Sequence, residues 1–569
     1  MDVAGGSPLW EQLRILNTVY LNAVTPTPSA TKTTNIIKTP LLPHQQTLQA
    51  AMYSHMTRMT NGCIIGDQII NGKLGIVADP PGTGKTLTIL SYLASIKDTP
   101  PRPTNELQPS SSRYFYSHIM QPVICDVSYC NLVIVPPTLL GQWEAEIKKH
   151  TNLAPYIIQT CRILKQASAP AAICKADFVL ATSSSYHHIT EFAAAHSIRW
   201  NNIFIDEASS IYFTANTPPL DFQFLWLISS SWIPFLFKGN TPSATNLLHL
   251  CSDPAVSTKI HAGLIEWLTA VKDDNIQFQT SLASSAFLKN YIPFSHPSRS
   301  ALIVRTATQT QLPPIQTRTI PCTSGSISLA ALFTADFDRV NIPAIYEQIG
   351  IKQLTLAETM EAHPDRAAII QSKSADDCAI CLDTPRTRTM TSCCNHSFCG
   401  ACILRHMVTR QHTCPTCRAQ LRPNMLNWLA ENMAHASAAA ATQIRSRKET
   451  CISILKESPQ NRVIIYTMYD NIYYQLADEL AADEIRVEKL DANPYNVARS
   501  VKAFLDGTSR VLCVTNPEHC RGISLTPATH IIFYHELPFY ELRQLLLHSA
   551  QRIGRSAPLN VVHLETAGL

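Results

Sequence analysis

The sequence predicts an α/β protein with two parallel-sheet lobes and a small two-zinc domain between them. Two blocks of sequence alternate short apolar strands with amphipathic helices, and a cluster of seven cysteines and one histidine at 378–417 separates them. Short β-branched runs separated by helices are typical of a parallel sheet covered on both faces. At 569 residues the chain is also too long for one ordinary hydrophobic core.

The first alternating block is expected at residues 36–315, after an N-terminal extension and linker at 1–35. A segment rich in proline and serine predicts a mobile surface insertion near 98–121. The other expected elements are strands at 74–78, 131–135, 178–181 and 203–206, and helices at 85–96 and 139–150.

The second alternating block is expected at residues 423–569. Between the blocks, the sequence predicts a helical or linker region at 316–372 and the zinc domain at 373–422. The expected elements of the second block are strands at 462–467, 510–515, 530–534 and 560–564, and helices at 471–482, 497–505 and 540–553.

The composition excludes several classes of protein. A hydrophobic content of 45% is that of a globular chain, and a net charge of +4 does not by itself indicate a nucleic-acid binder. The most apolar run, 224–237, is too short to span a bilayer, so no membrane partner is expected. No secretory signal is seen, and the cysteines outside the cluster are expected to be free thiols. We therefore expect an intracellular protein, nuclear or cytoplasmic.

The stretch G-T-G-K-T at 82–86 follows an expected strand and opens an expected helix. Backbone N–H groups of Gly82, Thr83 and Gly84 can cradle phosphate at a helix N-terminus. Lys85 would reach the β- and γ-phosphates, and the Thr86 hydroxyl would bind magnesium. The pattern therefore predicts a site for ATP with Mg²⁺.

A pair of acidic residues, Asp206 and Glu207, ends an apolar strand about 120 residues after the loop. Carboxylates at the carboxyl edge of a strand suit a magnesium ligand and a base that orients the attacking water. Together with Lys85, they are the candidate catalytic residues of the first lobe.

The cysteine cluster is spaced C-x2-C-x12-C-x-H-x2-C-x2-C-x11-C-x2-C. Four ligand pairs at such short spacings predict two tetrahedral zinc ions. The interleaved pairs favour a cross-brace, with Cys393 a rival to Cys394 for one ligand position. Because all positions are filled by protein, neither zinc would be open for catalysis.

These motifs together resemble the superfamily-2 motors of the Swi/Snf type, which have two RecA-like lobes. The resemblance covers most of residues 36–569 in an intact order. It implies that Asp79 opens the phosphate loop, that Gln45 reads adenine, that Gly522 contributes to the nucleotide site, and that Arg552 is an arginine finger. The matching segments are L-L-P-H-Q (41–45), A-D (78–79), I-V-P-P-T-L-L-G-Q-W (134–143), G-N-T-P (239–242), I-V-R-T (303–306), R-V-I-I-Y-T (462–467), R-G-I-S-L-T (521–526) and Q-R-I-G-R (551–555).

Several positions depart from that family's pattern. Ser209 replaces a histidine, Ser549 replaces an arginine, Asn240 is inserted in the third motif, and Cys520 with Arg521 precedes Gly522 where two glycines are usual. These departures bear on the efficiency of hydrolysis and on its coupling to translocation. We expect a slow but real DNA-stimulated ATPase.

The cysteine cluster resembles a RING domain. The resemblance implies that one zinc is held by Cys378, Cys381, Cys399 and Cys402, and the other by Cys394, His396, Cys414 and Cys417. It further implies that Ile380, Pro415 and Arg418 contact a ubiquitin-conjugating enzyme and ubiquitin. A RING between the lobes resembles the branch of the helicase-like transcription factor and its post-replication-repair relatives.

The resemblance implies a DNA-dependent ATPase or translocase combined with ubiquitin ligase activity, working as a monomeric motor on duplex DNA. Two alternatives remain: a ligase or scaffold with a degenerate ATP-binding motor, and a AAA-type ATPase. Duplex DNA would be gripped through its phosphates. The candidate phosphate contacts are Thr138, Lys148, Lys149, Thr182, Thr467 and Arg521.

Overall fold

A computed structural model gives the structure of the protein. The protein divides into two units, each described by itself. Residues 1–316, 462–531 and 537–560 form the first unit, which contains the first lobe and most of the second lobe. Residues 317–461, 532–536 and 561–569 form the second unit, which contains the cysteine cluster. The structure describes residues 8–25, 35–65, 68–97, 104–108, 117–121, 128–211, 220–237, 243–272, 299–307, 312–322, 342–349, 351, 353–409, 413–422, 425–429, 445–491, 493–537 and 539–566.

A seven-stranded sheet forms the centre of the first lobe. Its strand order is β11-β3-β10-β9-β6-β8-β7, and every neighbouring pair is parallel. The predicted α/β class is therefore confirmed. The bounds are β3 Leu74–Val77, β6 Ser128–Val135, β7 Pro155–Ile158, β8 Phe178–Thr182, β9 Ile198–Ile205, β10 Phe222–Ile228 and β11 Ile303–Val304.

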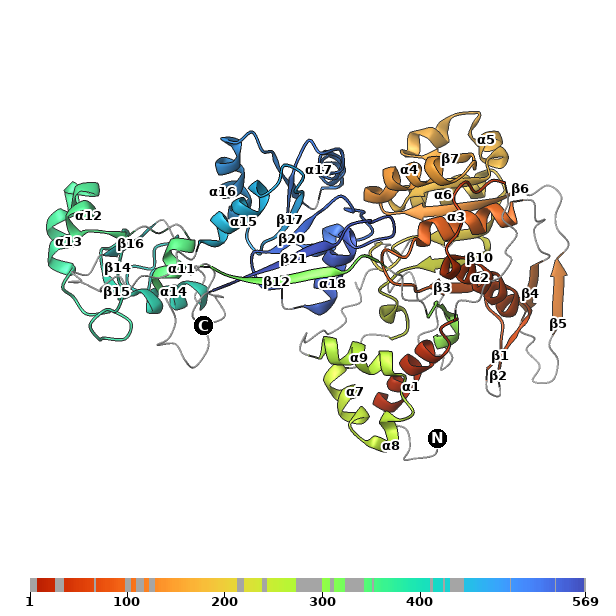
Figure 1. Ribbon diagram of the computed structural model, residues 1–569, viewed down its shortest axis with the longest axis horizontal. Helices are drawn as coiled ribbons and strands as arrows, with labels where there is room; N and C mark the ends of the chain where they lie inside the picture. The colour runs from red at the N-terminus through yellow and green to blue at the C-terminus, as the bar shows by residue number, and fades with distance from the viewer. Residues whose placement is uncertain are drawn as a thin grey trace. The chain divides into compact units, whose positions relative to one another are not determined.

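Helices cover this sheet because the crossovers of parallel strands return along its faces. Helix α2 packs on α3 and β3, while α5 and α6 contact β6 and β9 (Figure 1). Trp143, Trp200 and Trp226 are among the largest fully buried side chains. The bounds are α2 Pro43–Asn61, α3 Lys85–Ile96, α4 Leu140–His150, α5 Ala169–Lys175 and α6 Tyr186–Ala195.

The N-terminal segment differs from the predicted extension, because part of it belongs to the first lobe. Helix α1 (Pro8–Leu21) packs against α7 (Ala244–Cys251) and α9 (Ala262–Val271). Leu13 and Leu16 of α1 join the main hydrophobic core. After the helix, Val24 forms a parallel bridge with Thr306. The short α8 spans Pro254–Ser257.

Two antiparallel pairs of short strands form small sheets separate from the seven-stranded sheet. The predicted insertion near 98–121 contains an antiparallel pair, β4 (Thr104–Gln108) and β5 (Ser117–Gln121). A second pair, β1 (Cys63–Ile65) and β2 (Gln68–Ile70), follows α2.

The second lobe contains a six-stranded sheet in the order β12-β21-β20-β17-β19-β18, in which β17, β19 and β18 are parallel. Its predicted strands and helices are confirmed to within a few residues. Across the described residues, no helix combines the length and apolarity needed to cross a bilayer. The bounds are β12 Ile315–Cys322, β17 Val463–Tyr466, β18 Val487–Leu490, β19 Val511–Val514, β20 His530–Phe533, β21 Leu559–Thr566, α16 Asp470–Ala481, α17 Pro494–Asp506 and α18 Tyr540–Ala550.

The second unit contains the cysteine cluster and a small sheet of order β13-β16-β14-β15. Its core joins Ile345 and Tyr346 of α11 and Trp428 of β16 to Phe398 and Ile403 beside the cysteines. This core therefore extends beyond the predicted boundaries 373–422. The bounds are α11 Ile342–Gln348, β13 Gln353–Leu354, α12 Leu356–Ala362, α13 Ala367–Lys373, β14 Arg388–Thr391, β15 Ser397–Cys399, α14 Gly400–Thr409, β16 Leu426–Leu429 and α15 Arg447–Lys456.

Candidate nucleotide site and zinc centres

The candidate phosphate loop connects β3 to α3. Gly82 and Gly84 both have φ of 77°, a left-handed conformation that glycine adopts without steric cost. The Thr83 hydroxyl donates to the carbonyl oxygen of Pro80 at 2.9 Å and so holds the loop closed on itself. The sequence folds here into a glycine-rich turn at a helix N-terminus, as the motif predicts.

Lys85 lies in the first turn of α3. Its Nζ donates to the carbonyl oxygens of Asp79 at 3.0 Å and Pro80 at 2.9 Å. Burial lowers the pKa of Lys85, and the nearby carboxylates of Glu207, Asp79 and Asp206 oppose that shift. The ammonium is thus held inside the loop, where an anion would replace backbone carbonyls as its partner.

The Asp79 carboxylate connects the phosphate loop to Thr306, just after β11. Its two carboxylate oxygens accept from the backbone N–H and the hydroxyl of Thr306, each at 2.7 Å. Burial raises the pKa of Asp79, and the Thr306 hydrogen bonds act against that rise. The side chain is fully buried and ties the end of β11 to the loop, and a role of Asp79 in binding the nucleotide stays a prediction.

Gln45 and its neighbour His44 support the loop from α2. The Gln45 amide Nε2 lies 3.4 Å from the carbonyl oxygen of Thr83 and 3.3 Å from that of Gly84. His44 Nε2 lies 2.9 Å from the same Thr83 oxygen, and both side chains are buried. The contribution of His44 was missed, although it stands in the L-L-P-H-Q segment. The reading of adenine by Gln45 stays a prediction.

Asp206 and Glu207 follow β9, as predicted. Trp143 Nε1 of α4 donates to Asp206 Oδ2 at 2.8 Å, and the Glu207 N–H donates to Asp206 Oδ1 at 3.0 Å. Burial, followed by repulsion from Glu207, raises the pKa of Asp206 to about 6. Sequence reasoning missed Trp143, and the only signal for it was its place in the segment L-G-Q-W.

Glu207 has a buried carboxylate oxygen that a cation or a polar ligand could pair with. The residue has φ of 46°, and its Oε2 is buried with no hydrogen-bond partner within the described part of the chain. Leaving a buried carboxylate oxygen unpaired is costly, and such atoms are found where a ligand or water completes the site. The oxygen donors of Asp206, Glu207 and Thr86 are of the kind that Mg²⁺ prefers.

Arg552 approaches the phosphate loop from the end of α18. The N–H of Ile553 donates to the Gly82 carbonyl at 3.2 Å, and a Cβ added to Gly82 would lie 3.3 Å from Arg552 Cα. The guanidinium Nη1 donates to the Gly522 carbonyl at 3.0 Å. Burial lowers the pKa of Arg552, while Glu207 and Asp206 raise it. Arg552 and Lys85 therefore converge on the same loop.

Gly522 packs directly against the acidic pair. It has φ of 72°, and a Cβ on it would lie 2.5 Å from Leu139 Cδ1 and 3.3 Å from Glu207 Cγ. Only glycine fits this close approach without displacement. Of the positions that depart from the family pattern, Ser549 donates its hydroxyl to the Leu546 carbonyl of its own helix at 2.6 Å. The segment 239–242, which contains Asn240, lies outside the described residues.

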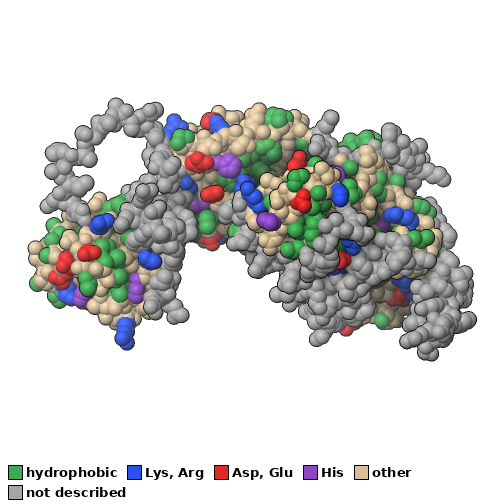
Figure 2. Space-filling view, turned by 90° about the horizontal axis from the view of Figure 1, so that it is seen from below, with side chains coloured by type: hydrophobic (Ala, Val, Ile, Leu, Met, Phe, Trp, Pro, Cys, Tyr) green, Lys and Arg blue, Asp and Glu red, His purple; other side chains and the backbone are tan. Residues whose placement is uncertain are grey.

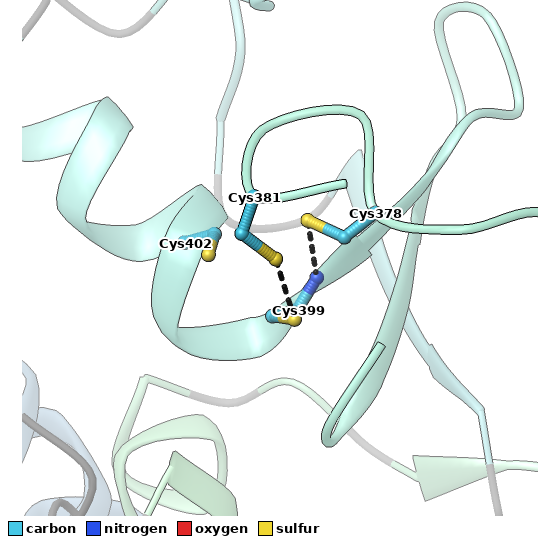
Figure 3. A group of neighbouring side chains, drawn as sticks. All are labelled: Cys378, Cys381, Cys399 and Cys402. Atoms are coloured by element: carbon cyan, nitrogen blue, oxygen red, sulfur yellow. Dashed lines mark hydrogen bonds between the residues drawn. The ribbon is translucent and has the colours of Figure 1, made fainter. Parts of the chain in front are cut away.

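The first zinc site gathers Cys378, Cys381, Cys399 and Cys402, whose Sγ atoms all lie within 4.8 Å of one another (Figure 3). The Sγ atoms of Cys381 and Cys399 are 3.6 Å apart, and the Cys399 N–H donates to Cys378 Sγ at 3.2 Å. Cys399 ends β15, and Cys402 lies in α14. Four converging thiols are a donor set that fits tetrahedral zinc.

At the second site, the structure brings Cys393 closer to the other cysteines than His396. The structure gathers Cys393, Cys394, Cys414 and Cys417 within 4.8 Å, and His396 lies outside this group. Both His396 ring nitrogens face other partners, because Nε2 lies 2.9 Å from Lys373 Nζ and Nδ1 lies 3.2 Å from the Cys394 carbonyl. His396 as a ligand of the second zinc therefore stays a prediction, with Cys393 as its rival.

The three candidate contacts for a conjugating enzyme lie next to the zinc ligands. Ile380 is 38% exposed although it is a large apolar residue. Pro415 is half-buried, and Arg418 is exposed with φ of 59°. The Arg418 N–H donates to the Cys414 carbonyl at 3.0 Å, so its backbone is fixed by a ligand residue.

Two sequence models match this chain. Residues 44–216 match the SNF2-related domain, and residues 378–417 match the C3HC4-type zinc finger, or RING finger. The chain carries an SNF2-related domain and a RING finger. The SNF2-related domain includes the phosphate loop and the acidic pair, and the RING finger begins and ends at the outermost cysteines of the two sites. The resemblance inferred from the motifs is confirmed.

The curated relatives that this chain matches are distant. DNA repair protein rad8 of Schizosaccharomyces pombe is 19% identical over 86% of this chain and 50% of its own length. A SWI/SNF-related matrix-associated actin-dependent regulator of chromatin subfamily A member 3-like 1 protein of Arabidopsis thaliana is 21% identical over 38% of this chain and 27% of its own length. The chain thus spans half or less of the length of these relatives.

A third curated relative matches only a short part of this chain. Postreplication repair E3 ubiquitin-protein ligase RAD18 of Eremothecium gossypii is 39% identical over 12% of this chain and 15% of its own length. Among solved structures, the SWI2/SNF2 ATPase core of Sulfolobus solfataricus in complex with double-stranded DNA covers 95% of this chain and 90% of its own, at 13% identity and a TM-score of 0.28. At that score, the likeness supports no inference about this chain.

Proposed function

We propose that the protein is a DNA-stimulated ATPase of the Swi/Snf type that also acts as a RING-type ubiquitin ligase. The observation that carries the first activity is the convergence of Lys85, Glu207 and Arg552 around one phosphate loop. The RING finger carries the second activity. We propose residues 36–315 and 445–569 as the ATPase lobes, with the α1 segment added to the first, and 342–429 as the zinc domain with its core, so that β16 belongs to the zinc domain and not to the second lobe.

In the proposed reaction, the N–H groups of residues 82–86 cradle the phosphates of ATP, and Lys85 neutralises their charge. Glu207 accepts a hydrogen bond from the attacking water and orients it toward the γ-phosphate. Arg552 leaves the Gly522 carbonyl to stabilise charge on the transferring phosphoryl group. Thr86 and Asp206 would hold Mg²⁺, which supplies electrostatic stabilisation of the phosphate oxygens.

Duplex DNA is the proposed activator, bound through its phosphates. Lys148 and Lys149 are exposed at the end of α4, whereas Thr182 and Thr467 are buried and bonded within their own turns. The lysines are therefore better candidates than the two threonines. On the face drawn in Figure 2, basic and acidic side chains are interspersed, which suits a narrow phosphate track rather than a broad basic field.

Phosphate release measured with and without duplex DNA tests the proposed ATPase. We expect a slow basal rate, stimulation by DNA that weakens steeply as salt is added, and neither activity in Lys85→Ala. Binding of ATP without release above the Lys85→Ala background would favour the alternative of a ligase or scaffold with a degenerate motor.

Replacing Trp143 by phenylalanine should raise the Mg²⁺ requirement of the ATPase about tenfold. A hydrogen bond to an ionised carboxylate contributes about 1.5–3 kcal/mol, so its loss raises the pKa of Asp206 further and weakens the cation site. The measurement is the Mg²⁺ concentration at half-maximal rate.

Trp200→Phe is the matched control for this substitution. Trp200 is equally buried, and its Nε1 has no hydrogen-bond partner among the residues described. Both variants lose indole volume, so both should lose some thermal stability, but only Trp143→Phe should shift the Mg²⁺ dependence. An equal shift in both variants would assign the effect to packing alone.

Replacing Ile380 by alanine should reduce autoubiquitination about tenfold, because a single buried apolar anchor at an interface is worth about 2 kcal/mol. Ile369→Ala is the control, since Ile369 is 48% exposed on α13 in the same unit. The assay is ubiquitin transfer across a panel of conjugating enzymes. Activity that is equal in both variants would remove Ile380 from the contact, and no transfer by the wild type would indicate a purely structural zinc domain.

A further inference from the structure

Three serines of the first lobe form a continuous chain of hydrogen bonds behind the acidic pair. Ser209 Oγ lies 2.8 Å from Ser229 Oγ, just beyond β10. Ser229 Oγ donates to the Ser231 carbonyl at 3.2 Å and accepts from the Ser231 N–H at 3.1 Å. Ser229 thus links the Ser209 hydroxyl to the backbone of Ser231.

The chain continues to the second lobe through Arg521. Its Nη1 donates to Ser231 Oγ at 3.1 Å. Its Nε and Nη2 are held by the Glu518 carboxylate at 2.7–3.0 Å, so the guanidinium is fixed in one orientation. Burial acts to lower the pKa of Arg521, but the carboxylates of Glu518 and Glu207 outweigh it, so the pKa is raised.

The residue after Arg521 touches both halves of the candidate active site. Gly522 packs against the Glu207 side chain, and its carbonyl accepts the Arg552 guanidinium. The next contact in this segment is the Ser524 N–H, which donates to Gln142 Oε1 at 3.2 Å. A shift of Arg521 would therefore move the backbone that positions Glu207 and Arg552 relative to each other.

We propose that Ser209, Ser229 and Ser231 form a relay of hydrogen bonds, which passes through the backbone and then the hydroxyl of Ser231, and that this relay positions Arg521, and through it Gly522, against Glu207 and Arg552. Ser229, at the centre of the relay, is fully buried, while Ser209 and Ser231 are half-buried. This inference rests on the proposed ATPase and specifies which residues couple its two lobes.

The test is a double-mutant cycle on the DNA-stimulated rate. Ser229→Ala and Ser231→Ala should each lower kcat about tenfold, with the KM for ATP unchanged, because neither side chain touches the loop. If both act in one relay, the double variant should lose no more than either single variant. Ser231→Thr keeps the hydroxyl and should restore the rate.

Ser210→Ala is the matched control, because the Ser210 hydroxyl lies beside Glu207 but donates to the Glu207 carbonyl and is outside the relay. A second readout needs no turnover: amide hydrogen exchange of residues 518–525 should accelerate in Ser229→Ala and not in Ser210→Ala. Additive losses in the cycle, or unchanged exchange at 518–525, would overturn the relay. Absence of DNA-stimulated hydrolysis in the wild type would instead refute the proposed function, and the exchange experiment would still decide the relay.

Discussion

Replacing Arg552 by alanine should lower the DNA-stimulated ATPase rate about a thousandfold, the usual worth of an arginine that neutralises a transferring phosphoryl group. The guanidinium already lies against the loop, held by the Gly522 carbonyl at 3.0 Å, and needs only to exchange that oxygen for a phosphate oxygen. Because this interaction strengthens in the transition state, the loss should appear in kcat, with a much smaller change in the KM for ATP.

Arg555→Ala is the control for this variant. Arg555 lies in the same segment, but its guanidinium donates to the carbonyl oxygens of Thr526, Ala528 and Pro558 and so holds the second lobe together. We expect Arg555→Ala to lower the melting temperature and to leave kcat within a few-fold of the wild type. Single-turnover rates for both variants, with thermal melts, separate the two roles. An Arg552→Ala enzyme with a nearly normal kcat would remove the finger from the mechanism.

The parts of this protein that the sequence predicts well are those encoded over short distances. The strands are apolar runs of about four to eight residues, and the phosphate loop is a glycine turn between β3 and α3, so local chemistry determines both. The zinc ligands of the first site are two C-x2-C pairs, each of which is a local turn. The α/β class and the order of the domains follow from these local signals.

The parts that were not predicted depend on pairs far apart in the chain. Asp79 bonds to Thr306, 227 residues away, and Trp143 bonds to Asp206, 63 residues away. These are ordinary residue types. The parallel register of β3 and β11 brings Asp79 to Thr306, and the position of α4 relative to the end of β9 brings Trp143 to Asp206. The position of Asp79 at the start of a phosphate loop predicts a nucleotide contact, and the local sequence gives no sign of its bonds to Thr306 at the sheet edge.

The assembly of the lobes also lies beyond local signals. The relay from Ser209 to Arg521 consists of residues that are individually unremarkable, and it joins segments 290 residues apart at its last step. From the sequence alone, Ser209 is read as the loss of a histidine. In the structure, its hydroxyl has a partner at 2.8 Å, so the substitution changes the link rather than removing it.

Removing zinc should unfold the second unit while leaving the first lobe folded. Structural zinc contributes about 10–16 kcal/mol per site in small metal-binding peptides, more than the 5–15 kcal/mol that typically stabilises a whole domain. The apolar core around Phe398, Ile403 and Trp428 is small, and it is built on the loops that the cysteines hold. Hydrogen exchange should therefore rise across residues 342–429 after chelation, and remain slow in β3, β6 and β9.

Single substitutions assign the ligands. Cys378→Ala should reduce bound zinc from two ions to one per chain and abolish autoubiquitination, whereas Cys513→Ala, which removes a fully buried thiol of β19, should keep two. On the observed geometry, Cys393→Ala loses the second zinc and His396→Ala retains it, because His396 is bonded to Lys373. The reverse result would return His396 to the ligand set that the C-x-H spacing predicts. A Cys378→Ala chain that keeps both ions and slow exchange would show that the fold of this unit does not depend on metal.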